Sequence, residues 1–315
     1  MSMKKDFLII CLLALFACSH KEEVPETGSV AVNVTVEEIG PCVARICATV
    51  SGTEELSDAF FSVSLADEPS VSSASTLTFN TNKLADGKMS ILFSSLSPVT
   101  TYYFKTRFIH NGENYDTPVK DFTTKDLPGG LVDMGLSVKW ASCNLGAGSP
   151  EGTGDRYAWG ETAPKSAFSW ENYKWCKGTK DSIDKYNGAD GLSVLLPEDD
   201  AATAALGAAW HIPTLEEVTE LIENSYWSWA AYHSAQGLAA TSKITGNAIF
   251  FPAADKGVVG NPEGLYWTAN VQGESDAACI RSWNGFAPFY PLVPINGGLS
   301  YQDRCEGAVI RPVSK

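Results

Sequence analysis

Tryptophan is confined to one part of this chain, and that confinement is the feature that most restricts how the chain can fold. All 9 Trp lie between Trp140 and Trp283, so the first 139 residues contain none. The 315 residues amount to roughly two domains, and the split predicts that the two are unlike. Apolar residues make up 44% and charged residues only 19%, which predicts packed cores rather than disorder.

The net charge excludes one large class of partners. Lys and Arg number 23 against 37 Asp and Glu, so the formal net charge is −14 at pH 7. Nucleic-acid binding depends on clustered Lys and Arg that displace counterions from phosphates, and no run of five or more basic residues occurs. We therefore expect no nucleic acid among the partners.

The N-terminus has the pattern of an export signal. A pair of lysines precedes an apolar run over residues 7–17, which is shorter than the roughly 20 residues of a membrane-spanning helix. Ala17 stands directly before Cys18, and this junction resembles a bacterial lipobox, although Phe16 departs from that pattern. The resemblance implies a signal peptide over residues 1–17 and a lipid on Cys18.

The residues after the cysteine extend this hypothesis. Residues 19–23 (Ser-His-Lys-Glu-Glu) resemble the surface-export tag of Bacteroidetes lipoproteins. We expect residues 18–28 to be a lipidated tether that holds the chain at the outer membrane, exposed at the cell surface, since two or three acyl chains anchor firmly. An ordinary cleaved secretory signal with an incidental Cys18 is the alternative.

Residues 29–125 predict an all-β domain. The segments 30–36, 44–50 and 60–65 alternate apolar and polar residues with period two, and turn residues separate them, which favours a sandwich of antiparallel sheets. The segment 96–107 (Leu-Ser-Pro-Val-Thr-Thr-Tyr-Tyr-Phe-Lys-Thr-Arg) resembles the turn, corner tyrosine and outgoing strand of fibronectin type III domains. The resemblance implies a spacer or interaction module.

A short linker over residues 126–130, with a proline and a glycine pair, leads into a second domain over residues 131–315. Several motifs occur in order there, and together they resemble the Fibrobacter succinogenes major paralogous domain, a family similar to the C-type lectin-like and formylglycine-generating-enzyme superfamily. The resemblance implies an α+β, C-type lectin-like domain. The motifs are the segments 131–147, 154–162, 196–202, 210–214, 266–268 and 309–313.

The residues of the second domain predict two helices followed by short strands. Thr214 and Glu217 form a capping box, and apolar residues recur at helical spacing over residues 215–224. Acidic residues precede an alanine-rich stretch from Ala201, as expected at a helix N-terminus. Segments 248–251 and 279–283 read as strands, which completes an α+β plan.

Most of the tryptophans are predicted to pack the core. Trp140, Trp159, Trp210 and Trp267 are the strongest core candidates because they lie within the motifs. His211 precedes the capped helix, where a structural hydrogen bond is favoured over catalysis.

Six cysteines remain after the signal and Cys18, and export through an oxidising periplasm allows up to three disulfides with 15 connectivities. The family commonly has a cysteine where this chain has Ser225; if Cys143 pairs with that position in relatives, it is unpaired here or joined to Cys176. We expect Cys279 to pair with Cys305.

One aromatic loop is the candidate ligand site. Aromatic rings can stack on sugars, and rings among Asn, Asp and Gly residues form a plausible platform for a glycan or a protein. Trp283-Asn284 faintly resembles a calcium-dependent lectin motif, but Gly285 stands where the ligand aspartate would be. The candidates are Trp283, Asn284, Phe286, Tyr290, Tyr301 and Asp303.

No cofactor is expected. Calcium stays open because residues 184–191 carry oxygen ligands, but this run lacks the spacing and terminal glutamate of an EF-hand, so an acidic turn is favoured.

No catalytic residue is assigned, because no nucleophile elbow, H-E-x-x-H helix or phosphate-binding loop occurs. The leading hypothesis is a non-catalytic, surface-exposed lipoprotein that presents a lectin-like domain for adhesion. One alternative is an enzyme of the formylglycine-type superfamily or a carbohydrate-active hydrolase. Another is a component of a surface assembly, and the oligomeric state stays open.

Overall fold

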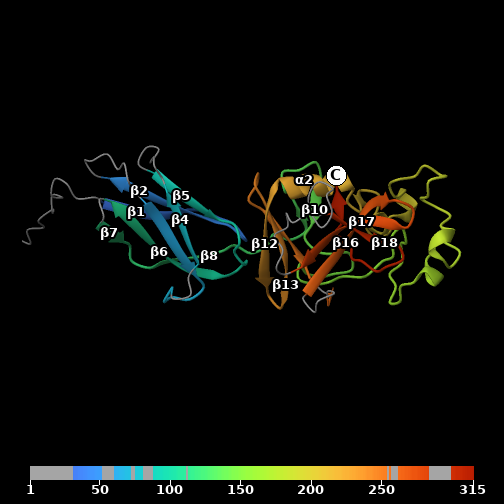
Figure 1. Ribbon diagram of the computed structural model, residues 1–315, viewed down its shortest axis with the longest axis horizontal. Helices are drawn as coiled ribbons and strands as arrows, with labels where there is room; N and C mark the ends of the chain where they lie inside the picture. Colours follow the sequence, from blue (N-terminus) through green and yellow to red (C-terminus); the bar gives the residue numbers. More distant parts are fainter. Residues whose placement is uncertain are drawn as a thin grey trace, which may run out of the picture.

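The computed structural model describes residues 31–51, 60–71, 75–80, 88–110, 113–253, 255–256, 262–283 and 299–315. Strand residues outnumber helical ones by 42% to 11%, so the protein is predominantly β. Two bodies lie end to end along the longest axis, with β1 to β8 in one and β9 to β19 in the other (Figure 1). Residues 1–30 and 284–298 lie outside the described residues, and with them Cys18, Asn284, Phe286 and Tyr290.

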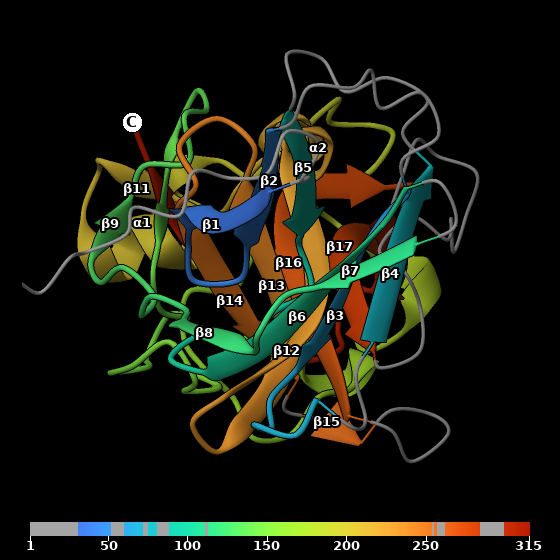
Figure 2. The same ribbon diagram turned by 90° about the vertical axis from the view of Figure 1, so that its left-hand side faces the viewer.

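The first body is a sandwich of two antiparallel sheets. One sheet has the order β1-β2-β5, and the other has the order β4-β3-β6-β7, with β8 paired to the other end of β6. Figure 2 shows the strands of this sandwich in front of the second body. The strands are β1 (Ala31–Ile39), β2 (Ala44–Ser51), β3 (Phe60–Ala66), β4 (Ser75–Asn80), β5 (Lys88–Phe93), β6 (Thr101–His110), β7 (Glu113–Asp116) and β8 (Lys120–Thr123).

The period-two patterning places the sandwich core between the sheets. In β5, Met89, Ile91 and Phe93 are buried while the residues between them face outward. Because successive strand side chains point to opposite faces, each strand supplies every second residue to one core. Ile46 of β2 and Phe104 of β6 join that core from the two sheets.

The corner tyrosine expected from the sequence is Tyr102. The backbone N–H of Ser97 donates to its hydroxyl at 2.9 Å, and its ring stacks on Phe122 at 5.9 Å between centroids. Thr124 adds a bond from its hydroxyl to the Ser97 carbonyl at 2.7 Å. These bonds satisfy backbone groups that the turn leaves without ladder partners, and so they fix where β6 begins.

The second body holds three small sheets. Their strand orders are β11-β19-β10-β9, β12-β13-β14 and β15-β16-β17-β18. The first of them joins the beginning and the end of this body, since β19 pairs with β10. The strands are β9 (Leu131–Val132), β10 (Lys139–Ala141), β11 (Trp210–His211), β12 (Ser225–Tyr232), β13 (Ala235–Ser242), β14 (Ala248–Pro252), β15 (Asp255–Lys256), β16 (Pro262–Gln272), β17 (Asp276–Trp283), β18 (Leu299–Asp303) and β19 (Val313–Ser314).

Two short α-helices begin where the sequence predicts. In α2 (Leu215–Glu223), Thr214 accepts from the backbone N–H of Glu217, whose carboxylate accepts from the N–H of Thr214. In α1 (Ala201–Leu206), Asp200 caps the first turn by accepting from the N–H of Thr203 at 2.9 Å. Three 3-10 helices, η1 (Trp170–Asn172), η2 (Lys180–Ser182) and η3 (Pro197–Asp199), lie in the long segment before α1.

Tryptophan packing matches the prediction at three of the four positions. Trp140, Trp159 and Trp267 are at most 1% exposed. Trp210 differs, because the two-residue strand β11 lies at the edge of its sheet and leaves the ring half-buried. The prediction of a core position for Trp210 is therefore wrong.

The two bodies meet through an apolar cluster. Cys42, in the turn between β1 and β2, is fully buried with Leu127 against Phe250 and Tyr232 of the second body. The Tyr232 hydroxyl donates to Asp126 at 2.8 Å. The sheet β12-β13-β14 is thus covered on both faces, and the predicted linker is a packed part of the junction.

In the part of the chain that is described, no helix is both long and apolar enough to cross a membrane.

Candidate ligand-binding site

The residues predicted to form a ligand platform are only partly described. Trp283 is the last residue of β17 and pairs with Glu263 of β16. Tyr301 and Asp303 lie on β18, which resumes after the undescribed segment 284–298.

Asp303 lies at the opposite end of the β17–β18 ladder from Trp283. In the β17–β18 ladder, Leu299 pairs with Ile280 at the loop end, whereas Asp303 pairs with Asp276 at the other end. The four-residue offset along β18 corresponds to about 13 Å. Asp303 instead accepts from Lys180 at 2.7 Å. In the described structure Asp303 ties the segment around η2 to the sheet, and its part in ligand binding stays a prediction.

Tyr301 keeps a position compatible with the prediction. It lies two residues from the start of β18 and pairs with Ala278. Its hydroxyl is buried and has no hydrogen-bond partner among the described residues.

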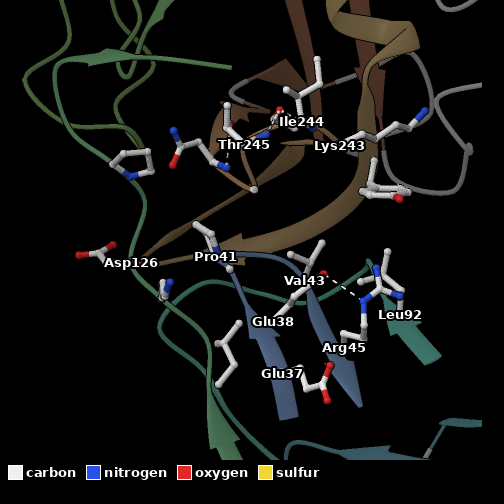
Figure 3. A pocket seen from close by; sticks show the side chains of 18 residues that line it. Glu37, Glu38, Pro41, Val43, Arg45, Leu92, Asp126, Lys243, Ile244 and Thr245 are labelled. Atoms are coloured by element: carbon white, nitrogen blue, oxygen red, sulfur yellow. Dashed lines mark hydrogen bonds and ion pairs between the residues drawn. The ribbon is translucent and has the colours of Figure 1, made fainter. Parts of the chain in front are cut away.

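A cleft of about 510 Å³ lies between the two bodies (Figure 3). This size falls within the range of small-molecule pockets, which occur preferentially at domain interfaces. The sandwich lines one side and the β13–β14 turn the other. The lining residues are Glu37, Glu38, Ile39, Gly40, Pro41, Val43, Arg45, Leu92, Lys125, Asp126, Pro128, Tyr226, Ser242, Lys243, Ile244, Thr245, Gly246 and Asn247.

Two local features of the sequence shape this cleft. The β1–β2 register shifts between Val36 and Glu38, and such a bulge re-aims side chains at a sheet edge. At Gly40, a Cβ would lie 2.7 Å from the Val43 side chain and 3.2 Å from the carbonyl oxygen of Gly246. Glycine therefore allows the sandwich to approach the opposite turn closely.

Charges of both signs face the cleft. Arg45 pairs with Glu38 at 3.1 Å. Across the cleft, the Lys243 ammonium donates to the Glu223 carbonyl at 2.7 Å and lies 5.5 Å from the centre of the Tyr226 ring. A half-buried ring in a cleft that also carries charged groups of both signs suits a polar ligand with hydroxyl groups rather than an apolar one.

This cleft was not predicted from the sequence. Tyr226 lies in a segment singled out only for its missing cysteine, yet its neighbour Trp227 is buried in the opposite face of β12. Large side chains stand two positions apart at residues 227 and 229, and this spacing is typical of a strand. On such a strand Tyr226 and Trp227 face opposite sides. The contact between the Tyr226 face of β12 and the sandwich joins segments that are distant in sequence, so local patterns do not predict it.

The acidic segment considered for calcium forms a hydrogen-bonded turn. Asp190 accepts from the backbone N–H groups of Tyr186 and Leu192. The bond from the Leu192 N–H, together with that from Tyr186, lowers the Asp190 pKa against a smaller opposing effect of burial. Within the described ranges, no group of three or more His, Cys, Asp and Glu residues is placed to hold a metal ion.

His211 forms the structural hydrogen bond that its position favours. Its Nε2 lies 3.0 Å from one carboxylate oxygen of Glu217, the residue that also caps α2. Burial raises the Glu217 pKa, but the bonds from His211 and Thr214 outweigh burial, and the net shift is downward. The pair thus links β11 to the start of α2.

All six cysteines in the described ranges have free thiols, and the β17–β18 ladder holds the predicted pair Cys279 and Cys305 apart. Cys279 pairs across the ladder with Ser300, whereas Cys305 follows the end of β18 at Asp303. The three residues from Ser300 to Asp303 already span about 10 Å, beyond the roughly 4.4–6.8 Å between disulfide-linked Cα atoms.

Cys143, expected to be unpaired or joined to Cys176, has a free thiol in the structure, as Cys176 does.

The chain matches no protein-family model and no curated protein. Several solved structures are similar over about a third of it. The sensor domain of the anti-sigma factor RsgI4 from Pseudobacteroides cellulosolvens is 22% identical and covers 32% of this chain and 97% of its own, with a TM-score of 0.26. A computationally redesigned β-sandwich protein is 18% identical and covers 30% and 94%, with a TM-score of 0.24. The third fibronectin III domain of the human KIAA0343 protein is 16% identical and covers 32% and 85%, with a TM-score of 0.23.

Proposed function

We propose that this protein is a non-catalytic lipoprotein of the outer membrane that presents its second domain at the cell surface to bind a glycan or another protein. Lipidation of Cys18 anchors it. The first domain is fibronectin III-like and acts as a stalk. The second is a Fibrobacter major paralogous domain of the lectin-like type.

The observation that carries this proposal is the direction of β1. Ile39, at the end of β1, lines the cleft against the second body, whereas β1 begins at the opposite end of the sandwich (Figure 1). Nine strand residues span about 30 Å. A tether attached before Ala31 therefore leaves the second domain as the part farthest from the membrane.

The packed junction adds to this support. The buried cluster around Cys42 and Leu127 joins the stalk to the sheet β12-β13-β14 without a free linker. A stalk that holds its distal domain firmly orders it before a ligand arrives, which reduces the entropy lost on binding. The corner tyrosine and the sheet orders β1-β2-β5 and β4-β3-β6-β7 favour the fibronectin III-like assignment.

Two places remain for the ligand in this proposal. One is the aromatic loop that begins at Trp283, and the other is the cleft around Tyr226 and Lys243. The full chain is tested on a glycan array and by pull-down from surface extracts. Trp283→Ala and Tyr226→Ala distinguish the two places, and Tyr103→Ala, on the sandwich, is the matched control. A full chain that retains neither a glycan nor a protein would overturn the binding proposal.

The anchor is tested separately. In the native host, the wild type is expected in the outer-membrane fraction, labelled by a fatty-acid probe and accessible to protease on intact cells. Cys18→Ala is expected to lose the label. Wild-type protein without the label would contradict lipidation.

A further inference from the structure

Residues 303–305 are docked onto the segment 173–186 through three consecutive side chains. Asp303 accepts from Lys180 at 2.7 Å. Arg304 donates to the carbonyls of Tyr186 at 2.8 Å and Lys185 at 3.0 Å. The third residue, Cys305, is 3% exposed and packs on Tyr173 in one apolar cluster.

Cys176 packs against the same cluster. Its thiol donates to the Trp170 carbonyl at 3.0 Å, and a β-bridge to Ile183 fixes its backbone. Among the six cysteines in the described ranges, Cys176 and Cys305 are the two that share a hydrophobic cluster. Contacts on both sides of Cys176, to Tyr173 and to Lys180, keep this segment against Cys305.

We propose that Cys176 and Cys305 form a disulfide when the protein is in an oxidising compartment. The bond would join the loop-rich segment around η1 and η2 to the end of β18. The proposal rests on the export of the chain in the proposed function, because a reducing compartment would keep both thiols reduced.

The chemistry is thiol–disulfide exchange with a small-molecule or protein disulfide as oxidant. The Cys176 thiolate attacks one sulfur of the oxidant, forming a mixed disulfide and releasing one thiolate. Cys305, as it loses its proton to solvent, then attacks the Cys176 sulfur and releases the second thiolate. Two protein thiols lose two electrons and two protons, and the oxidant disulfide is reduced to two thiols.

The burial of the two cysteines supports this order. Cys176 is half-buried and can be reached by the oxidant, whereas Cys305 is buried and reacts within the protein. Burial raises the Cys305 pKa to about 12. Since the thiolate is the nucleophile, we expect the closing step to accelerate as the pH rises towards that value.

Peptide mapping tests the pairing directly. The purified full chain is equilibrated with oxidised and reduced glutathione, alkylated and digested with trypsin without reduction. The expected product is residues 175–177 (Trp-Cys-Lys) linked to residues 305–315, since trypsin does not cleave between Arg311 and Pro312. Cys143→Ser, a control at another half-buried thiol, should keep this product, and Cys176→Ser should abolish it.

Stability provides the second readout. Oxidised wild type and Cys143→Ser are expected to melt about 5–10 °C higher than the reduced forms, and Cys176→Ser should show no such difference. Linkage of Cys176 to a different cysteine, or a folded chain with no linked peptide, would overturn the proposal. Because this oxidation is carried out on purified protein, failure here is distinguishable from failure of export, which the Cys18 experiment measures.

Discussion

The two bodies differ in how their buried backbone N–H and C=O groups find hydrogen-bond partners. In the sandwich, strand ladders pair most backbone groups, and aliphatic and phenyl side chains fill the space between the sheets. In the second body, the long segment between β10 and α1 has 3-10 turns and isolated β-bridges in place of α-helices and strands, and side chains donate to its carbonyls. The indole N–H of Trp267 donates to Tyr157 at 2.7 Å, and that of Trp175 donates to Gly160 at 2.8 Å.

This difference gives a physical reason for the tryptophan split. An irregular segment leaves carbonyls without ladder partners, and an unpaired buried carbonyl is costly. Tryptophan fills a large volume and carries one donor, so it can pack and satisfy a carbonyl together. In a sandwich the regular ladders already pair the carbonyls, so fewer side-chain donors are needed. The core of the sandwich contains no Trp.

The largest expected effect is at Arg311, which is 1% exposed. Its guanidinium donates to the carbonyls of Ala141, Ser142 and Phe250 and to the Asn144 side chain. Arg311→Met should destabilise the second body by about 3–5 kcal/mol, because four acceptors lose their donor. Denaturant unfolding followed by tryptophan fluorescence reports on this body alone.

The control for Arg311 is Lys139→Met, which removes an exposed charge from the neighbouring strand β10. It should leave the fluorescence transition unchanged. If both variants unfold at the same denaturant concentration, side-chain bonds to carbonyls do not hold the second body together.

The next effect is at Asp199, which is 2% exposed. Its carboxylate accepts from Lys185 at 2.5 Å, Tyr186 at 2.7 Å and Lys174 at 3.3 Å. Asp199→Asn should cost about 1.5–3 kcal/mol at pH 7, since charge-assisted bonds are lost. The control is Asp181→Asn, an exposed position in the same segment.

The same carboxylate should make the second body sensitive to acid. Burial raises the Asp199 pKa, but the bonds from its donors outweigh burial and lower it below the ordinary 3.8. The stabilisation is therefore fully present above about pH 4 and is lost as the pH falls through the lower, folded-state pKa. A thermal melting series from pH 6 to pH 2 should fall less steeply in Asp199→Asn than in wild type.

A smaller effect is expected at the corner of the sandwich. Tyr102→Phe removes the acceptor of the Ser97 N–H and should cost about 1 kcal/mol, because the site is only partly buried. Far-UV circular dichroism, which also reports on the Trp-free sandwich, measures it. Tyr103→Phe, at the adjacent half-buried tyrosine, is the control and should unfold like wild type.

The smallest effect is expected at the surface of the sandwich. Arg107 and Asp116 form a bidentate pair at 2.7 and 2.8 Å, but both side chains are half exposed. Solvent screens such pairs, so Arg107→Ala should leave the unfolding midpoint unchanged within error. A clear loss of stability would show that the sandwich also depends on specific side-chain bonds.

Local patterns anticipated the regular parts of the fold well. The capping box predicted α2 within one residue, and the turn before Tyr102 predicted the sandwich corner. Both signals are short-range, because a cap or a turn is decided by residues that are neighbours in the chain. The cleft around Tyr226 and the cluster shared by Cys176 and Cys305 were not predicted, since each joins segments more than a hundred residues apart.

The sequence by itself determined that the chain has two unlike parts, that the first is made of alternating strands, and where the second places its helices. These depend on periodicity and composition, which act locally. Only the tertiary structure decided that Arg304 and Arg311 are buried, that Asp303 binds Lys180, and which thiols are neighbours. Burial and pairing are properties of the surroundings, and in this chain the surroundings come from residues far away in sequence.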